Sequence, residues 1–193
     1  MNSKYLYYLI VTLICISSVN AHILAGESGL SSGMTHPLFG LDHLLAMIAV
    51  GIISVQIGRK AIWLLPLTFV SVMVVGGILG ILGIKLMGVE YGIAFSVIIL
   101  GIAIALARKF PIIWAMIFVA IFALFHGHAH GEELPSIASP ILYVLGFVFV
   151  TTLLHISGIL IGHYAKKTQI TQKLLQGIGI AVSMIGVYFL MIV

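Results

Sequence analysis

The chain has 193 residues, of which 62% are hydrophobic and only 7% are charged. Soluble domains carry about 25% charged residues, so this composition excludes a soluble protein and predicts an integral membrane protein. The formal net charge of +4 does not indicate nucleic-acid binding, because the basic residues stand in small groups between apolar runs.

Residues 1–21 have the pattern of a secretory signal peptide, with Lys4 ahead of an apolar core at about 5–16 and small residues before the expected cleavage site. Cleavage would make His22 the first residue. It would also remove Cys15, the only cysteine, and so exclude disulfides and thiolate metal sites. The alternative is a retained first helix, although about 12 apolar residues are few for a membrane span.

Residues 22–193 are predicted to form a single transmembrane domain of six helices, an all-α polytopic helix bundle. Residues 22–35 are polar and rich in Gly and Ser, which is typical of an exposed loop. Apolar runs long enough to cross a membrane follow at about 37–57, 61–84, 91–107, 110–126, 138–163 and 173–192.

Basic residues are concentrated on one of the two predicted sides of the membrane. Lys85 is alone on one side, whereas the other side has Arg59, Lys60, Arg108, Lys109, Lys166, Lys167 and Lys173. The positive-inside rule makes the second side cytoplasmic. We therefore expect a protein of the bacterial inner membrane with the mature N-terminus and the C-terminus both periplasmic.

Small residues repeat at helical spacing on three of the spans. This pattern predicts close helix packing. The residues are Gly76, Gly80 and Gly83, then Gly158 and Gly162, then Gly179, Ser183 and Gly186.

The first polar cluster interrupts the first predicted span. If Pro37 takes the first helical position, the helix continues to about Ile57 and carries Asp42 and His43 below the membrane surface. A carboxylate at that depth costs about 3 kcal/mol, so a functional role is the default hypothesis. At helical spacing His36 and His43 share one stripe, whereas Asp42 points about 100° away from His43.

The second cluster is FHGHAHGEELP, residues 125–135, at the outer end of the fourth span. In a continuous helix His126 and His130 would share one face, and His128 and Glu132 would share the opposite face. Two intervening glycines would permit the chain to unwind, so that all four side chains could reach one ion. The alternative is a His-rich exterior loop that binds metal only incidentally.

Further histidines lie at other depths. His22, if it is the mature N-terminus, could chelate a cation through its amine and its imidazole. His155 lies in the cytoplasmic half of the fifth span, where a histidine can also simply bond between helices, and His163 is expected at the interface. The methionines at 47, 73 and 184 are interpreted as packing residues, because methionine is a common filler of cores.

These donors predict a series of metal ligands and no prosthetic group or catalytic residue. Imidazoles with a few carboxylates suit Ni²⁺, Co²⁺ or Zn²⁺, whereas Mg²⁺ and Ca²⁺ prefer oxygen ligands. The complete set of candidate metal ligands is His22, His36, Asp42, His43, His126, His128, His130, Glu132 and His155.

The H-x5-D-H motif in HPLFGLDHLLAM, followed by HGHAHGEELP, resembles the HupE/UreJ family of nickel and cobalt permeases, which are hydrogenase and urease accessory membrane proteins. The spacing is one residue longer than in the H-x4-D-H signature of the larger nickel/cobalt transporters. The resemblance implies metal-handling roles for His36, Asp42, His43, His126, His130 and Glu132.

The sequence therefore predicts an inner-membrane permease, not an enzyme, that passes Ni²⁺ or Co²⁺ inward along His, Asp and Glu ligands. The expected partners are the ion and the lipid bilayer, with no nucleic acid; a second copy of the chain and nickel-enzyme maturation proteins are further candidates. Two alternatives remain: a membrane-embedded zinc hydrolase with Glu132 or Glu133 as base, and a metal-binding accessory or sensor protein that does not conduct.

Overall fold

The computed structural model describes residues 29–136 and 138–193, and in these ranges it is built of helices and connecting turns without strands. The all-α prediction is thus confirmed. The predicted signal peptide and His22 lie outside the described residues. The helices are α2 (Gly29–Phe39), α3 (Leu41–Ile57), α4 (Ala61–Ile81), α5 (Val89–Leu106), α6 (Ile112–Glu132), α7 (Pro140–Ala165) and α8 (Gln169–Ile192).

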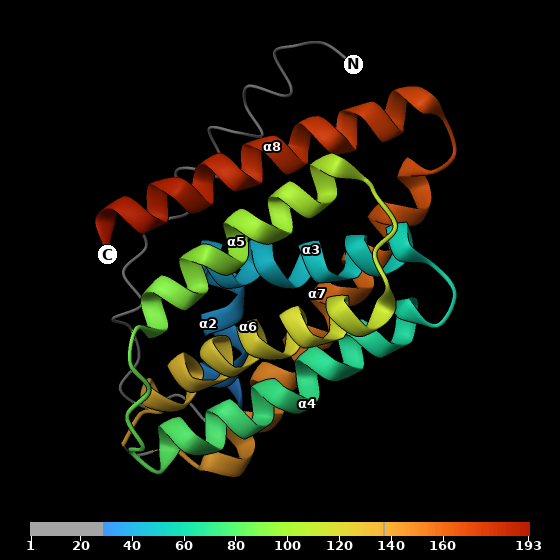
Figure 1. The fold of residues 1–193 in the computed structure, drawn as a ribbon. Helices are drawn as coiled ribbons and strands as arrows, with labels where there is room; N and C mark the ends of the chain where they lie inside the picture. The colour runs from blue at the N-terminus through green and yellow to red at the C-terminus, as the bar shows by residue number, and fades with distance from the viewer. Residues whose placement is uncertain (1–28, 137) are drawn as a thin grey trace.

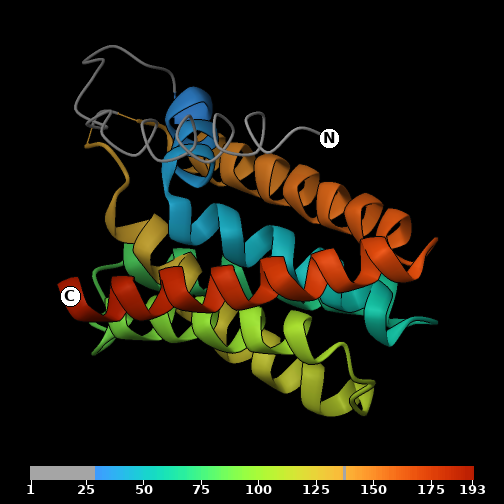
Figure 2. The ribbon, with the colours of Figure 1, turned by 90° about the horizontal axis from the view of Figure 1, so that it is seen from above.

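The first span is broken. Helices α4 to α8 are each long and apolar enough to cross a membrane, and α2 with α3 makes a sixth candidate that is bent by 79° at Gly40. Figure 2 shows the short α2 standing across the direction of the long helices. The prediction of one helix from Pro37 to Ile57 is therefore wrong, because Pro37 lies inside α2 and a new helix begins at Leu41.

Helix α2 packs against the start of α7, which explains both its direction and its helical structure. A Cβ on Gly33 would lie 2.1 Å from Tyr143 O, and one on Gly146 would lie 2.4 Å from Leu30 O, so the two backbones touch. Residues from Gly29 onward are therefore helical, and the exposed loop predicted for 22–35 is wrong for this part.

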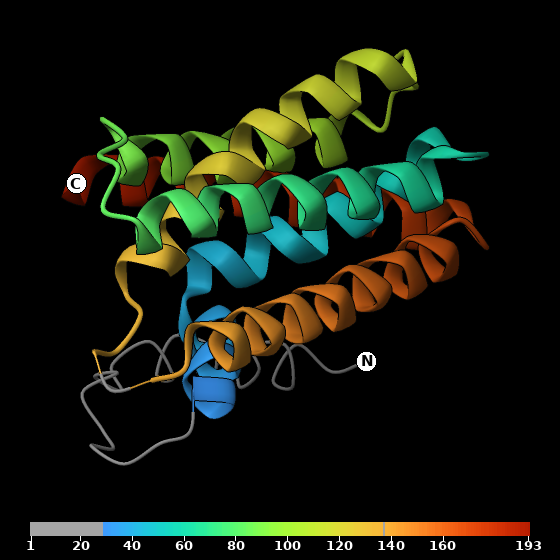
Figure 3. The ribbon, with the colours of Figure 1, turned by 90° about the horizontal axis from the view of Figure 1, so that it is seen from below.

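The long helices run back and forth, so their connections gather at two ends (Figures 1 and 3). The turns after α3, α5 and α7 share one end with all seven basic residues predicted to be cytoplasmic. The turns after α4 and α6, the α2–α3 break and Val193 share the other end with Lys85.

Glycines bring three pairs of helices into backbone contact, as the small-residue repeats predicted. A Cβ on Gly76 of α4 would lie 2.4 Å from Leu124 O of α6, and one on Gly158 of α7 would lie 2.1 Å from Ile48 O of α3. In the same way Gly179 of α8 lies against Gly101 of α5. Gly83 is an exception, because it follows the end of α4 with φ of 70° and has no neighbour within 4 Å.

The outside of the helix bundle is as apolar as its interior. Large apolar residues such as Trp63 and Ile141, each 73% exposed, cover the outside, where lipid would meet them. The apolar interior also holds buried polar side chains, namely His43, Ser54, Ser96, His126, His128, His130, Thr151 and His155. Five histidines in an apolar interior require partners, and their positions define the site.

Candidate metal centre

Three helices bring His36, His43 and His130 together. One ligand nitrogen from each of these side chains lies within 4.8 Å of the others, on α2, α3 and α6 respectively. The ring centroids of His36 and His43 are 4.9 Å apart, and each lies 4.8 Å from that of His130. We call these three residues the outer cluster.

Asp42 fixes the orientation and tautomer of His43. One carboxylate oxygen, Oδ1, accepts the backbone N–H of His43 at 2.8 Å and lies 2.9 Å from its ring Nδ1. Because a carboxylate only accepts, Nδ1 carries the proton and Nε2 carries the lone pair. Nε2 is buried and has no hydrogen-bond partner, so it is free to ligate a cation. Second-shell carboxylates orient metal-binding histidines in this way.

Ser96 fixes the tautomer of His126 through a hydrogen bond to its hydroxyl oxygen. The Ser96 hydroxyl donates its proton to Ile93 O at 2.7 Å, so its oxygen accepts from His126 Nε2, 2.9 Å away. The lone pair of His126 is thus on Nδ1, which is buried and unpartnered. The ring lies 4.6 Å from that of His43, which places His126 directly beside the outer cluster.

The other two rings of the cluster also present free nitrogens. His36 Nδ1 pairs with a carboxylate oxygen of Glu133, which leaves His36 Nε2 as the unpartnered atom. His130 stacks on Phe147 with ring centroids 5.0 Å apart, and both of its nitrogens lack a partner. Four imidazoles therefore offer nitrogens whose hydrogen-bonding capacity nothing in the described structure satisfies. A single cation could be held by three of them, those of His36, His43 and His130.

Helix α6 remains continuous through Glu132, so the predicted unwinding at its glycines does not occur. His128 and Glu132 consequently lie on the face away from the outer cluster, with His128 Nδ1 3.4 Å from a Glu132 oxygen. His128 Nε2 donates to Ile84 O at 2.7 Å. The two glycines instead pack α6 against α4, with a Cβ on Gly127 only 2.0 Å from Met73 O.

Two further histidines of the described residues, His155 and His163, are separate from the outer cluster. His155 of α7 is buried, and its ring lies 5.1 Å from that of Phe69, which in turn lies 5.7 Å from the ring of His126. His163 is exposed near the opposite end of α7, and its predicted place at the membrane interface stays a prediction.

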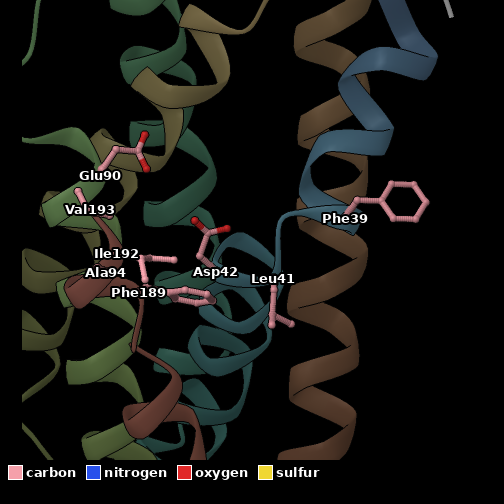
Figure 4. Close-up of a pocket in the computed structure, with 8 residues that line it drawn as sticks. All are labelled: Phe39, Leu41, Asp42, Glu90, Ala94, Phe189, Ile192 and Val193. Carbon is pink, nitrogen blue, oxygen red and sulfur yellow. The ribbon is translucent and has the colours of Figure 1, made fainter. Parts of the chain in front are cut away.

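Asp42 also faces a pocket that opens beside the outer cluster. The pocket has a volume of about 290 Å³, and Figure 4 shows the carboxylates of Asp42 and Glu90 inside it, between the starts of α3 and α5 and the end of α8. Glu90 was not among the sequence candidates. The available signal was an acidic residue in the first turn of an apolar span, at the same end as the two motifs.

Comparison with known proteins agrees with the two motifs. Residues 10–189 match the family described as HupE / UreJ protein. Protein HupE of Rhizobium leguminosarum bv. viciae is 44% identical over 163 residues, which cover 83% of this chain and 85% of that protein. The chain belongs to the HupE/UreJ family. No solved structure matches it significantly.

Membership in the HupE/UreJ family also bears on the zinc-hydrolase alternative. This is a family of transport and accessory proteins rather than of enzymes, so the zinc-hydrolase alternative is not supported. Glu133, one of the two glutamates that this alternative offered as a base, pairs with His36 in the outer cluster.

Proposed function

We propose that this HupE/UreJ chain is a permease of the bacterial inner membrane that admits Ni²⁺, or Co²⁺, from the periplasm. The observation that supports it best is the set of buried imidazole nitrogens of His36, His43, His126 and His130 that lack hydrogen-bond partners. Three of these residues can approach one ion, and the fourth lies beside them.

The chemistry of the outer cluster suits a borderline divalent ion. Imidazole nitrogens favour Ni²⁺, Co²⁺ and Zn²⁺ over Mg²⁺ and Ca²⁺. Three protein ligands leave coordination positions for water, which helps an ion to be released again. Asp42, Glu90 and Glu133 lie around the same end, where negative charge would attract a cation and partly offset the cost of its dehydration.

The depth of the ligands supports inward passage. Glu133 is 50% exposed and His36 is 23% exposed, whereas His43 and His130 are buried and His126 lies one helical turn deeper along α6. We infer that an ion passes from His36 to His43 and His130 and then towards His126, with His155 further in. The roles of His22, His128 and Glu132 as ligands stay predictions from the sequence.

The test is flux into liposomes that contain only this chain. We expect saturable uptake of Ni²⁺ and Co²⁺, no uptake of Mg²⁺, and loss of uptake in the His43→Ala and His130→Ala variants. His163→Ala, at the exposed opposite end of α7, is the matched control and should transport like wild type. Cu²⁺ binding alone is not informative, because Cu²⁺ binds most nitrogen sites tightly.

Two outcomes would contradict the proposal. Saturable Ni²⁺ binding without flux would favour the accessory or sensor alternative. Unchanged flux in well-folded His43→Ala and His130→Ala proteins would exclude the outer cluster as the path.

A further inference from the structure

Two methionine sulfurs converge on one buried hydroxyl below the outer cluster. The Thr151 hydroxyl oxygen of α7 lies 3.3 Å from Met47 Sδ of α3 and 3.6 Å from Met73 Sδ of α4, so its single proton is shared between two sulfur acceptors. All three side chains have an exposed fraction of 0%. A helical threonine usually donates to the carbonyl four residues earlier, as the neighbouring Thr152 does to Val148 O at 2.8 Å.

Methionines that only fill space in the core would not need both sulfurs to point at the same hydroxyl. Methionine fills gaps with a flexible side chain whose sulfur has no need of a particular direction. Here thioethers from two different helices meet at the buried hydroxyl of a third helix. We call Met47, Met73 and Thr151 the sulfur layer.

The sulfur layer lies one helical turn inward from the outer cluster. Met47 follows His43 by four residues on α3, and Thr151 follows Phe147, the residue that stacks on His130, by four residues on α7. An ion that leaves the outer cluster along α3 and α7 would therefore meet the sulfur layer next.

His155 lies one further turn inward and is unsatisfied. It follows Thr151 by four residues on α7 and is 1% exposed. Both of its ring nitrogens are buried without a partner, although one of them must carry a proton. Leaving a polar atom unsatisfied in an apolar interior costs about 1–3 kcal/mol of stability. A ligand bound to the His155 ring would remove this cost.

Phe69 connects these levels. It precedes Met73 by one turn on α4, and its ring contacts those of His126 and His155, with centroids 5.7 and 5.1 Å away. Ring contacts therefore join His43 of the outer cluster to His126, Phe69 and His155, and Met47 and Met73 belong to the same buried core cluster as Phe69.

We propose that the sulfur layer and His155 form a second, inner metal site with thioether, hydroxyl and imidazole donors, selective for borderline and soft transition-metal ions. This rests on the proposed function, because the ion would arrive from the outer cluster. Thioethers bind soft and borderline ions and reject Mg²⁺, Ca²⁺ and Mn²⁺. Helices α4 and α7 carry no carboxylate, and the nearest one on α3, Asp42, lies five residues before Met47. Because none of its own donors is charged, this site holds a dication more weakly than the outer end does and releases it.

X-ray absorption at the nickel edge tests the inner site directly. The purified full chain carries Cys15→Ser, so that any sulfur bound to nickel must be a thioether. At saturating Ni²⁺ we expect nickel–sulfur scattering together with nickel–imidazole scattering. The double variant Met47→Leu/Met73→Leu conserves volume and should fold. It should lose the sulfur scattering, keep Ni²⁺ at the outer cluster, and lose at least tenfold in Ni²⁺ flux.

Met184→Leu is the matched control, because Met184 is 68% exposed on α8; it should change neither signal. Scattering from nitrogen and oxygen alone at saturating Ni²⁺ would overturn the inner site. So would wild-type flux in the double variant, and the proposed permease function would then still stand. Sulfur scattering in a chain that binds Ni²⁺ without any flux would keep the inner site and overturn the permease.

Discussion

Asp42 affects the outer cluster by orienting His43 and is not itself one of the three grouped ligands. Its carboxylate holds Nδ1–H of His43, so the free lone pair is on Nε2. The helical wheel placed the two side chains about 100° apart, yet neighbouring residues at the first turn of α3 can meet, because the Asp42 side chain folds back onto the His43 backbone N–H.

Asp42→Asn should abolish Ni²⁺ transport while expression and folding stay normal. Asparagine keeps the shape and can accept the same hydrogen bond, but it removes the charge that raises the basicity of His43 and compensates a dication. A loss of 10–100-fold in affinity is typical of such second-shell changes. Equilibrium Ni²⁺ binding on purified protein measures it, with His163→Ala as control. Wild-type affinity in Asp42→Asn would reduce this carboxylate to a packing role.

His128 and His130 differ by only two residues but have different surroundings. His130 faces the outer cluster with two free nitrogens, whereas His128 donates to the backbone oxygen of Ile84 just beyond α4. We expect His130→Ala to lose Ni²⁺ binding. His128→Ala should keep the binding but lower the free energy of unfolding by about 1 kcal/mol, because the hydrogen bond from His128 Nε2 to Ile84 O is lost.

The comparison needs two measurements on each variant, Ni²⁺ titration and thermal unfolding. The reverse pattern, with lost binding in His128→Ala and normal binding in His130→Ala, would return His128 to the set of ligands that the sequence suggested.

At the scale of the elements, the contact between α4 and α6 positions His126 and His130. Gly127→Ala would place a Cβ 2.0 Å from the backbone oxygen of Met73, which cannot rotate away. The two helices must then separate, and both histidines move with α6. We expect loss of Ni²⁺ binding and a lower unfolding temperature.

Gly177→Ala is the control for that change, because a Cβ there has nothing within 4 Å and the residue also lies inside a helix. It should leave binding and stability close to wild type. Equal and mild effects of the two substitutions would show that α6 does not depend on this contact.

The sequence predicted five of the six spans closely, because long apolar runs bounded by charged turns have few alternatives in a membrane. It missed the break at Gly40, since hydropathy continues across it and the direction of α2 depends on tertiary contact of Gly33 with Tyr143. Residues 126 to 132 could be helical or unwound by sequence alone. Their glycines serve the approach of α4 rather than unwinding, and this again depends on a distant helix.

The residues of the outer cluster and its neighbours could be named from the sequence, although their arrangement could not. His36, His43 and His130, with Asp42 and His126 beside them, were candidates because polar groups in apolar spans are costly. The sulfur layer could not, since Met47 and Met73 are indistinguishable from packing residues until their sulfurs are seen at the same hydroxyl.

For the whole molecule, charge is separated between the two ends. The carboxylates of the described residues, Asp42, Glu90, Glu132 and Glu133, lie at the end with the outer cluster, whereas seven of the basic residues lie at the opposite end. If the positive-inside rule holds for this chain, the outer cluster opens to the periplasm, and the direction of capture follows from the fold.

Single cysteines at the two ends test this orientation. In a Cys15→Ser background, Met87→Cys lies in the turn after α4 at a position that is 92% exposed, and Gln169→Cys is exposed at the start of α8. Neither substitution alters a charge, so the positive-inside signal is unchanged. A membrane-impermeant thiol reagent should label Met87→Cys in intact spheroplasts and Gln169→Cys only after lysis. The opposite labelling would place the carboxylates and the outer cluster in the cytoplasm, and the chain would then have to collect its ion from inside the cell.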